Sequence, residues 1–422
     1  MKKDTVATHF GYDTKVGAGA MAVPIYATTA YDFGSAQTAA NRFALAELGP
    51  IYSRLTNPTL DVLEARFAEF DDGAASISVA SGEAAIFYAV ANLVEAGDNI
   101  LVSSKIYAQS LLTHTFKRFG VEARIFDPDE AKGLEKLIDD KTRAIFFESL
   151  SNPQIAIPNI ENIVAVAKKY KIVTIVDNTV ATPVLFNAFK HGIDVSVYSA
   201  TKYVGGQGNT IGGIVVSSKG LNKLLKANPR YAHFNEPDPS YHGLIYANLP
   251  EAFDVFTLRI RLSLLRDIGA TLSPHSAFSL IQGLETLGIR MKRHCENAQK
   301  VAEFLSSHPR VKAVNYPGLK TDKFYEKAQK YLNGGASALL SFDVGDKELA
   351  VRVINAVKLF SIVVNIGDSK SLITHPASTT HSQLSPQELE AAGIGAGIIR
   401  LSIGIEDADD LIADLDAALK NA

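Results

Sequence analysis

Residues 172–183 read IVTIVDNTVATP, and residues 191–203, a few positions further on, read HGIDVSVYSATKY. The first stretch begins with a continuous β-branched run, which is typical of a strand buried on both faces. That run ends in Asp177, and the second stretch leads into Lys202. Ligands of open parallel α/β sheets bind beyond the carboxyl ends of the strands, so these two residues are the first candidates for a functional site.

Similar short apolar runs occur on both sides of these stretches and alternate with segments of helical spacing. We predict strands at residues 75–80, 99–103, 122–126, 143–148, 172–177, 194–198 and 212–217. This alternation predicts an α/β fold, with a mostly parallel sheet and helices on both faces. Helical spacing dominates from about residue 256, and further strands are expected at 311–315, 338–342 and 398–403. We therefore predict an N-terminal arm (1–58), an α/β domain (59–255) and a smaller C-terminal α+β domain (256–422).

Composition favours small-molecule chemistry. The 422 residues include 42 basic and 45 acidic side chains, and the net charge of −3 predicts no strong attraction to nucleic acid or to anionic membranes. Cys295 is the only cysteine, which rules out an intramolecular disulfide and a Cys-rich metal site and fits a reducing compartment. There is no apolar run of about 18 residues and no apolar segment behind the N-terminal lysines, so we expect a cytoplasmic protein. We also expect no metal site.

Asp177 and two other candidates follow predicted strands. Ser81-Gly82-Glu83 opens a helical stretch, where free backbone N–H groups and the positive end of the helix dipole suit a phosphate. Serine is also a common helix cap, so this signal is weak alone. Asp177 could bind a metal, act as a base, hold a protonated ring nitrogen, or simply cap a turn. Asn152 follows the fourth strand and could equally be turn chemistry.

Lys202 lies in the segment with the most features that suggest a functional site. It is flanked by the hydroxyls of Ser199 and Thr201 and by a glycine-rich loop at residues 205–208. In a low-dielectric site the pKa of the lysine would fall, which makes the neutral amine available for imine chemistry, while the hydroxyls could bind phosphate. The alternative is a salt-bridged lysine in a turn. Nucleotide binding by the glycine loop is disfavoured, because the loop lacks both the P-loop ending and the dinucleotide-fold spacing.

Read together, these motifs resemble one known family. Asp177-Asn-Thr-x-Ala-Thr-Pro, Gly192-Ile-Asp194 and Ser199-Ala-Thr-Lys202-Tyr resemble the signature of the Cys/Met-metabolism enzymes, a fold-type I family that depends on pyridoxal 5'-phosphate (PLP), and the similarity covers essentially the whole chain. A lysine for a Schiff base, a carboxylate for the ring nitrogen and a phosphate site are what PLP requires. The resemblance implies that Lys202 carries PLP and that Asp177 pairs with its ring nitrogen.

The resemblance also implies roles for other residues. The implied phosphate ligands are Ser81, Gly82, Glu83, Ser199 and Thr201, while Tyr107 stacks on the ring. Arg54 and Tyr52 of the arm are implied to complete a neighbouring subunit's cofactor site, which means a dimer at least and usually a tetramer with shared active sites. An ordinary interface pair is the alternative for both. Catalytic roles are implied for Lys202, Tyr107 and Tyr52.

At the C-terminal end, Arg400 resembles the family arginine that binds the substrate α-carboxylate, with Asn152 assisting it. A structural salt bridge is the alternative for Arg400.

Within the family, residues 52–59, 239–244, 365–372 and 374–381 look most like the O-acetylhomoserine sulfhydrylases. We therefore expect γ-replacement on O-acetyl-L-homoserine with sulfide, giving L-homocysteine and acetate in methionine biosynthesis. Alternatives in the family are a cystathionine γ-synthase, an O-succinylhomoserine sulfhydrylase and a methionine γ-lyase. A non-catalytic binding or regulatory protein is the alternative of another class. The sulfur donor stays open between sulfide, a small thiol such as methanethiol, and a thiocarboxylated carrier protein.

Three positions depart from the family pattern. Glu83 stands where a neutral side chain is usual, Gln207 replaces a common histidine, and Ala108-Gln109-Ser110 replaces a frequent Gly-Gly-Thr. We expect these changes to affect rates and substrate preference rather than cofactor binding.

Overall fold

The computed structural model describes residues 1–379 and 395–422, and its main feature is a seven-stranded sheet. Its strand order is β1-β7-β6-β5-β4-β2-β3, and β7 is antiparallel to both of its neighbours while the other pairs are parallel. The strands are β1 (Ala75–Val79), β2 (Asn99–Ser103), β3 (Glu122–Phe126), β4 (Thr142–Glu148), β5 (Val173–Asp177), β6 (Val195–Ser199) and β7 (Gly213–Ser217). The prediction of a mostly parallel sheet is confirmed, and each predicted strand is present within one or two residues.

The central strands are apolar throughout because the sheet is buried on both faces. Phe146 and Phe147 of β4 are both fully buried, but they belong to two separate apolar cores on opposite faces of the sheet. Successive side chains of a strand point to opposite faces, so a strand between two cores needs apolar residues at every position. Helices α3 (Pro58–Phe70) and α6 (Ile160–Tyr170) contribute to one core, and α4 (Gly82–Ala91) contributes to the other.

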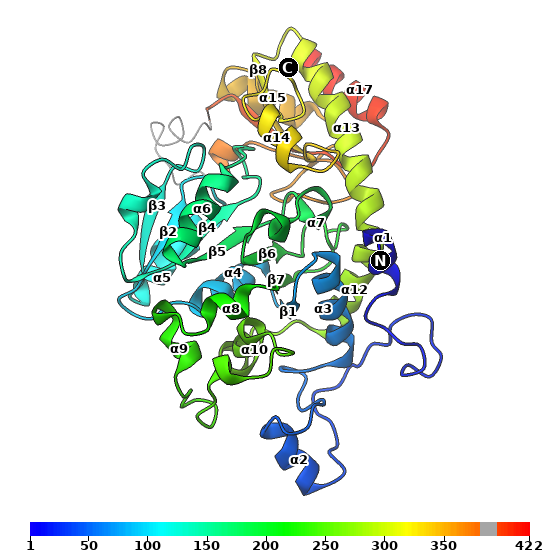
Figure 1. Ribbon diagram of the computed structural model, residues 1–422. Helices are drawn as coiled ribbons and strands as arrows, with labels where there is room; N and C mark the ends of the chain where they lie inside the picture. Colours follow the sequence, from blue (N-terminus) through cyan, green and yellow to red (C-terminus); the bar gives the residue numbers. More distant parts are fainter. Residues whose placement is uncertain (380–394) are drawn as a thin grey trace.

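A second, five-stranded sheet lies beyond the long helix α13 (Leu287–Ser307), at the top of Figure 1. Its order is β10-β11-β12-β9-β8, and the strands are β8 (Ala313–Asn315), β9 (Leu339–Asp343), β10 (Ser361–Ile362), β11 (Leu372–Thr374) and β12 (Ile398–Ser402). The helices around it are α14 (Tyr325–Tyr331), α15 (Lys347–Ala356) and α17 (Ala408–Asn421). The three predicted strands of this region are confirmed. Strands β10 and β11 were not predicted, because two or three residues are too few to show an alternating pattern.

The helices that follow the first sheet and precede the second sheet in the sequence pack on the first sheet. Phe256 of α10 (Val255–Arg259) lies in the same core as β1 and β2, and α12 (Pro274–Glu285) packs against α3. The division of the chain at residue 256 stays a prediction. Cys295 of α13 is buried, and burial raises the pKa of its thiol to about 11, as befits a structural cysteine.

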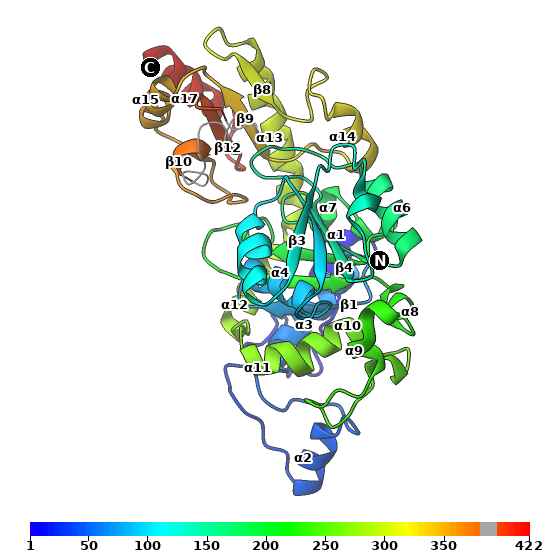
Figure 2. The same cartoon turned by 90° about the vertical axis from the view of Figure 1, so that its left-hand side faces the viewer.

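The N-terminal arm extends from the body of the chain. Helix α1 (Lys3–His9) packs on α3 and α12, whereas α2 (Ala36–Phe43) has no buried residue and stands away from the other elements in both views (Figure 1, Figure 2). Apolar side chains of the arm are exposed, with Val16 at 79% and Met21 at 87%. Within the described part of the chain, no helix combines the length and the apolar character needed to cross a bilayer. Thr380 and His381, which end the motif at residues 374–381, lie outside the described residues.

Candidate active site

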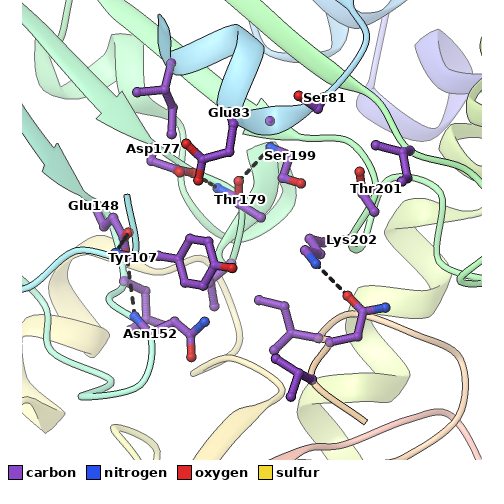
Figure 3. Close-up of a pocket in the computed structure, with 18 of the residues that line it drawn as sticks. Ser81, Glu83, Tyr107, Glu148, Asn152, Asp177, Thr179, Ser199, Thr201 and Lys202 are labelled. Atoms are coloured by element: carbon purple, nitrogen blue, oxygen red, sulfur yellow. Dashed lines mark hydrogen bonds between the residues drawn. The ribbon is translucent and has the colours of Figure 1, made fainter. Parts of the chain in front are cut away.

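A cavity of about 280 Å³ lies at the carboxyl ends of the parallel strands, where the loop between β10 and β11 covers them. It brings together ten residues predicted from the sequence: Ser81, Gly82, Glu83, Tyr107, Asn152, Asp177, Ser199, Thr201, Lys202 and Arg400. Figure 3 shows most of these side chains around one space. Residues from six separate stretches of the chain therefore meet in one site.

One end of the cavity is formed by the start of α4. Ser81 caps this helix, with its hydroxyl accepting a hydrogen bond from the N–H of Ala84 at 3.1 Å. A Cβ atom at Gly82 would lie only 2.6 Å from the Cβ of Ser199, so only glycine lets the helix start approach the end of β6 this closely. The first N–H groups of a helix have no partner inside the helix and carry the positive end of its dipole. This end of the cavity suits a phosphate group.

The hydroxyl residues beside this helix start are held by hydrogen bonds between side chains and backbone. The N–H of Ser199 donates to Oγ1 of Thr179 at 2.8 Å. Oγ1 of Thr201 accepts from the N–H of Gly212 at 3.0 Å and donates to its carbonyl oxygen at 3.2 Å. Since a hydroxyl has one proton, Thr201 would have to turn its O–H away from Gly212 to donate to a phosphate.

At the opposite end, three carboxyl groups come together. Asp177 and Glu148 are adjacent in the register of β5 and β4, and burial raises the pKa of both. The negative charge of Asp177 raises the pKa of Glu148 further. Glu83, in the first turn of α4, also has a raised pKa, caused first by burial and then by the charge of Asp177. Figure 3 shows the Glu83 and Asp177 side chains directed toward one another. A protonated ring nitrogen at this end would relieve the repulsion among these groups.

Glu148 also holds two loops of the site, a role that the sequence analysis missed. Its carboxylate accepts a hydrogen bond from the N–H of Tyr107 at 2.5 Å and from the N–H of Asn152 at 3.2 Å (Figure 3). The only local signal was its place at the end of β4, which matches the place of Asp177 at the end of β5. Glu148 thereby fixes the backbone of two residues that line the cavity.

Lys202 also lines the cavity and is half-buried. Burial lowers the pKa of its amine, and the positive charge of Arg400 lowers it further. Its Nζ donates to Oδ1 of Asn365 at 2.5 Å, and no ion pair involves Lys202 among the described residues. The alternative of a salt-bridged lysine is therefore not supported, and the lowered pKa favours the neutral amine more than in a solvated lysine.

Arg400, on β12, lines the cavity, and its bonds to described residues use only some of its hydrogen-bond donors. One guanidinium nitrogen donates to Oδ1 of Asn152 at 3.1 Å and the other to the main-chain oxygen of Asn365 at 2.9 Å. Its Nε has no partner among the described residues, and burial lowers the pKa of the guanidinium to about 10. No carboxylate of the described chain pairs with this cation, which argues against a structural salt bridge and suits the binding of a carboxylate ligand.

The arm residues are not part of this cavity in the single chain. Tyr52 is 43% exposed, and the guanidinium of Arg54 lies 5.5 Å from the centre of its ring. Tyr107, in contrast, lines the cavity and is 58% exposed, so one face of its ring is available for stacking. The role of Tyr52 and Arg54 in a neighbouring subunit stays a prediction.

The residues present fit PLP. The closely packed helix start would seat the phosphate, Asp177 would hold the proton of the ring nitrogen, and Lys202, whose pKa is lowered, would form the imine. Arg400, which lines the cavity and has no carboxylate partner among the described residues, would bind an amino-acid carboxylate.

Comparison with known proteins agrees with this geometry. The family model described as Cys/Met metabolism PLP-dependent enzyme matches residues 4–420. The chain is 43% identical to an O-acetyl-L-homoserine sulfhydrylase of Leptospira meyeri, over 100% of this chain and 97% of the relative. It is 40% identical to an O-acetyl-L-homoserine sulfhydrylase of Corynebacterium glutamicum, over 98% and 95%.

A solved structure from Campylobacter jejuni, described as a putative O-acetylhomoserine (thiol)-lyase with a pyridoxyl-lysine phosphate residue, superposes with a TM-score of 0.96 at 55% identity, over the full length of both chains. The match extends over both sheets and over every element that supplies a residue to the cavity. The chain belongs to the Cys/Met-metabolism family of PLP-dependent enzymes.

Proposed function

We propose that the protein catalyses γ-replacement on O-acetyl-L-homoserine with sulfide, giving L-homocysteine and acetate. The observation that carries the proposal is the presence, in one cavity, of a half-buried lysine of lowered pKa and an arginine that has no carboxylate partner among the described residues. The full-length similarity to O-acetyl-L-homoserine sulfhydrylases supports the choice of substrate.

The residues at the two ends of the cavity would hold the cofactor. Ser81, Ser199, Thr201 and the N–H groups of Gly82 and Glu83 would bind the phosphate, and Asp177 would hold the proton of the ring nitrogen. Bound to an amino acid, PLP withdraws electrons from Cα and so makes its proton removable. Glu83 adds a further carboxyl beside Asp177 and Glu148, which strengthens the preference of this end for a protonated ring.

The substrate would be held by its α-carboxylate. Arg400 would bind the α-carboxylate, and the amide of Asn152, itself bonded to Arg400 and placed by Glu148, would orient it. Tyr107 would cover the ring and exclude water from that face.

Lys202 would carry the protons. Its amine would remove the proton from Cα, take part in the loss of the Cβ proton as acetate leaves, and return protons to both carbons after sulfide has added at Cγ. The C–O bond to acetate breaks and the C–S bond to sulfide forms, so no oxidant or reductant is needed. The lowered pKa of Lys202 suits this exchange, because the amine must be able to both accept and release a proton near neutral pH.

We also propose that the active site is shared between subunits, with Tyr52 and Arg54 reaching the cofactor phosphate of a neighbour. The exposed arm and the position of both residues outside the cavity of their own chain support this arrangement. Mixing inactive Lys202→Ala subunits with inactive Arg54→Ala subunits tests it. Recovery of activity in the mixed oligomer is expected, and no recovery despite subunit exchange would refute the shared site.

The test of the reaction is homocysteine production by the PLP-loaded protein from O-acetyl-L-homoserine and sulfide. O-Succinyl-L-homoserine replaces the acetyl ester in one comparison, and cysteine or methanethiol replaces sulfide in others, with Lys202→Ala as the control without the base. Homocysteine from the acetyl ester alone supports the proposal. Cystathionine as the main product, or activity only with the succinyl ester, would refute it. A poor rate with every free thiol would point to a carrier protein as sulfur donor.

A further inference from the structure

We propose that Asn365 is a positioning residue for Lys202, whose side-chain oxygen holds the lysine amine while that amine is free. The inference deepens the proposed function, because it assigns a partner to the group that would carry protons to and from the substrate. Asn365 comes from the loop between β10 and β11, 163 residues away from Lys202 in the chain.

Asn365 contacts both basic side chains of the cavity. Its Oδ1 accepts a hydrogen bond from Nζ of Lys202 at 2.5 Å, and its main-chain oxygen accepts one from Arg400 at 2.9 Å. The residue therefore holds the amine of Lys202 at a fixed place relative to the guanidinium that would bind the substrate carboxylate. In an amino acid, Cα is bonded directly to the carboxylate carbon. A carboxylate bound to Arg400 would therefore place Cα close to the amine.

The position of Asn365 is imposed by the fold rather than by its bond to the lysine. A Cβ atom at Gly367, which has φ +75°, would lie 2.6 Å from the backbone nitrogen of Tyr203 and 3.0 Å from the carbonyl carbon of Lys202. Two residues further on, the N–H and the hydroxyl of Ser369 both donate to the carbonyl oxygen of Gly206, at 2.8 and 2.7 Å. The loop is thus pressed onto the backbone that follows Lys202 and holds Asn365 in place.

An amide is the appropriate acceptor for this task. A neutral amide oxygen accepts a hydrogen bond from an amine and leaves the amine's lone pair free to take a proton. A carboxylate at the same place would favour the ammonium form and raise the pKa of the lysine. The other charged or titratable groups around the lysine in the cavity are Arg400, Tyr107, Asp177, Glu83 and Glu148, and of these Arg400 acts on it most strongly after burial.

The experiment follows the exchange of the Cα hydrogen of L-norvaline in D2O by NMR, catalysed by the holoenzyme. L-Norvaline has no leaving group, so exchange reports proton transfer at Cα alone. A second readout is the affinity for L-norvaline, measured from the change in visible absorbance of the bound cofactor. The variants are Asn365→Ala and Asn365→Asp, and Val363→Ala is the matched control because Val363 lies in the same loop, is 45% exposed and does not line the cavity.

For Asn365→Ala we expect exchange to slow by at least about tenfold, because general acid–base transfer depends on a positioned group. The affinity for L-norvaline should stay close to that of the wild type. For Asn365→Asp the pH midpoint of exchange should rise by about one unit or more, since a carboxylate stabilises the ammonium form. Val363→Ala should behave like the wild type.

Unchanged exchange in Asn365→Ala would overturn the inference. So would a loss of exchange matched by an equal loss of L-norvaline affinity, because Asn365 would then act through Arg400. Failure of the proposed function is a separate outcome: a wild-type protein that exchanges L-norvaline but makes no homocysteine would reject the substrate while the effect of Asn365 on Lys202 still supports its positioning role.

Discussion

Replacing Arg400 by lysine tests how the cavity recognises a carboxylate. A guanidinium has five N–H donors, and two of those of Arg400 are used on Asn152 and Asn365. Three remain, including the Nε–H, which has no acceptor among the described residues. An α-carboxylate can accept two of them side by side, and a hydrogen bond to a charged group contributes about 1.5–3 kcal/mol.

A lysine at this position keeps the charge but offers a single point of contact, so about one of the two bonds is lost. The expected loss of about 1.5–3 kcal/mol corresponds to a dissociation constant for L-norvaline that is about 10- to 150-fold larger. Titration of the Arg400→Lys holoenzyme with L-norvaline, followed by visible absorbance, measures this constant. The spectrum without amino acid should be unchanged, because Arg400 is not among the residues that we propose to bind the cofactor.

Two results would refute this reasoning. Unchanged L-norvaline affinity in Arg400→Lys would show that the free donors of Arg400 do not contact the carboxylate. Loss of the cofactor spectrum in the same variant would show that Arg400 serves cofactor binding. Arg400→Met is the matched comparison, since it removes the charge at similar length and should weaken binding more than the lysine variant.

Three further predictions concern the lysine, the carboxyl groups and the core. Lys202→Ala should abolish the visible absorbance of the lysine-linked cofactor, and an unchanged spectrum would rule out Lys202 as the point of attachment. Glu148→Gln leaves one acceptor for the N–H groups of Tyr107 and Asn152; we expect weaker L-norvaline binding and a cost of about 1–3 kcal/mol, seen as a lower thermal midpoint, whereas wild-type values would contradict the clamp. Burial raises the pKa of Asp71, which accepts from Ser196 and Tyr198, to about 7. Its protonated form therefore favours folding, and this contribution is complete below the unfolded pKa of about 4 and is lost as pH rises to about 7. Relative to Asp71→Asn, the wild-type thermal midpoint should fall across this range, and a constant difference would contradict the assignment.

The structure shows where the carboxyl group of Glu83, a position at which the family usually has a neutral side chain, is directed. The sequence predicted only that its N–H would bind phosphate and that a charge there was unusual. The side chain turns toward Asp177, and both pKa values are raised. The extra carboxyl therefore lies at the end of the cavity proposed for the ring nitrogen, while its backbone belongs to the helix start proposed for the phosphate.

The parts of the site that the sequence predicted are those with local signals. Strand β5 and its terminal Asp177 could be read from a buried run followed by a polar residue, because a strand between two cores must be apolar at successive positions. Lys202 stood out because hydroxyl and glycine neighbours do not suit a solvated surface lysine. The carboxyl ends of parallel strands meet at one edge, so these residues could be expected to converge.

Tertiary structure alone decided which residues from distant segments complete the site. Asn365 lies between two strands that are too short to show periodicity, and it meets Lys202 only because Gly367 lets its loop press on the backbone of Tyr203. Glu148 fixes Tyr107, 41 residues away in the chain, only because the loop after β2 reaches the end of β4. Local sequence determines the period of an element and the residue at its end, whereas contacts between elements depend on how whole sheets and loops pack. The sequence by itself therefore determined the fold class and the candidate residues for cofactor binding, and the packing of the second sheet on the first decided the partners of Lys202 and Arg400.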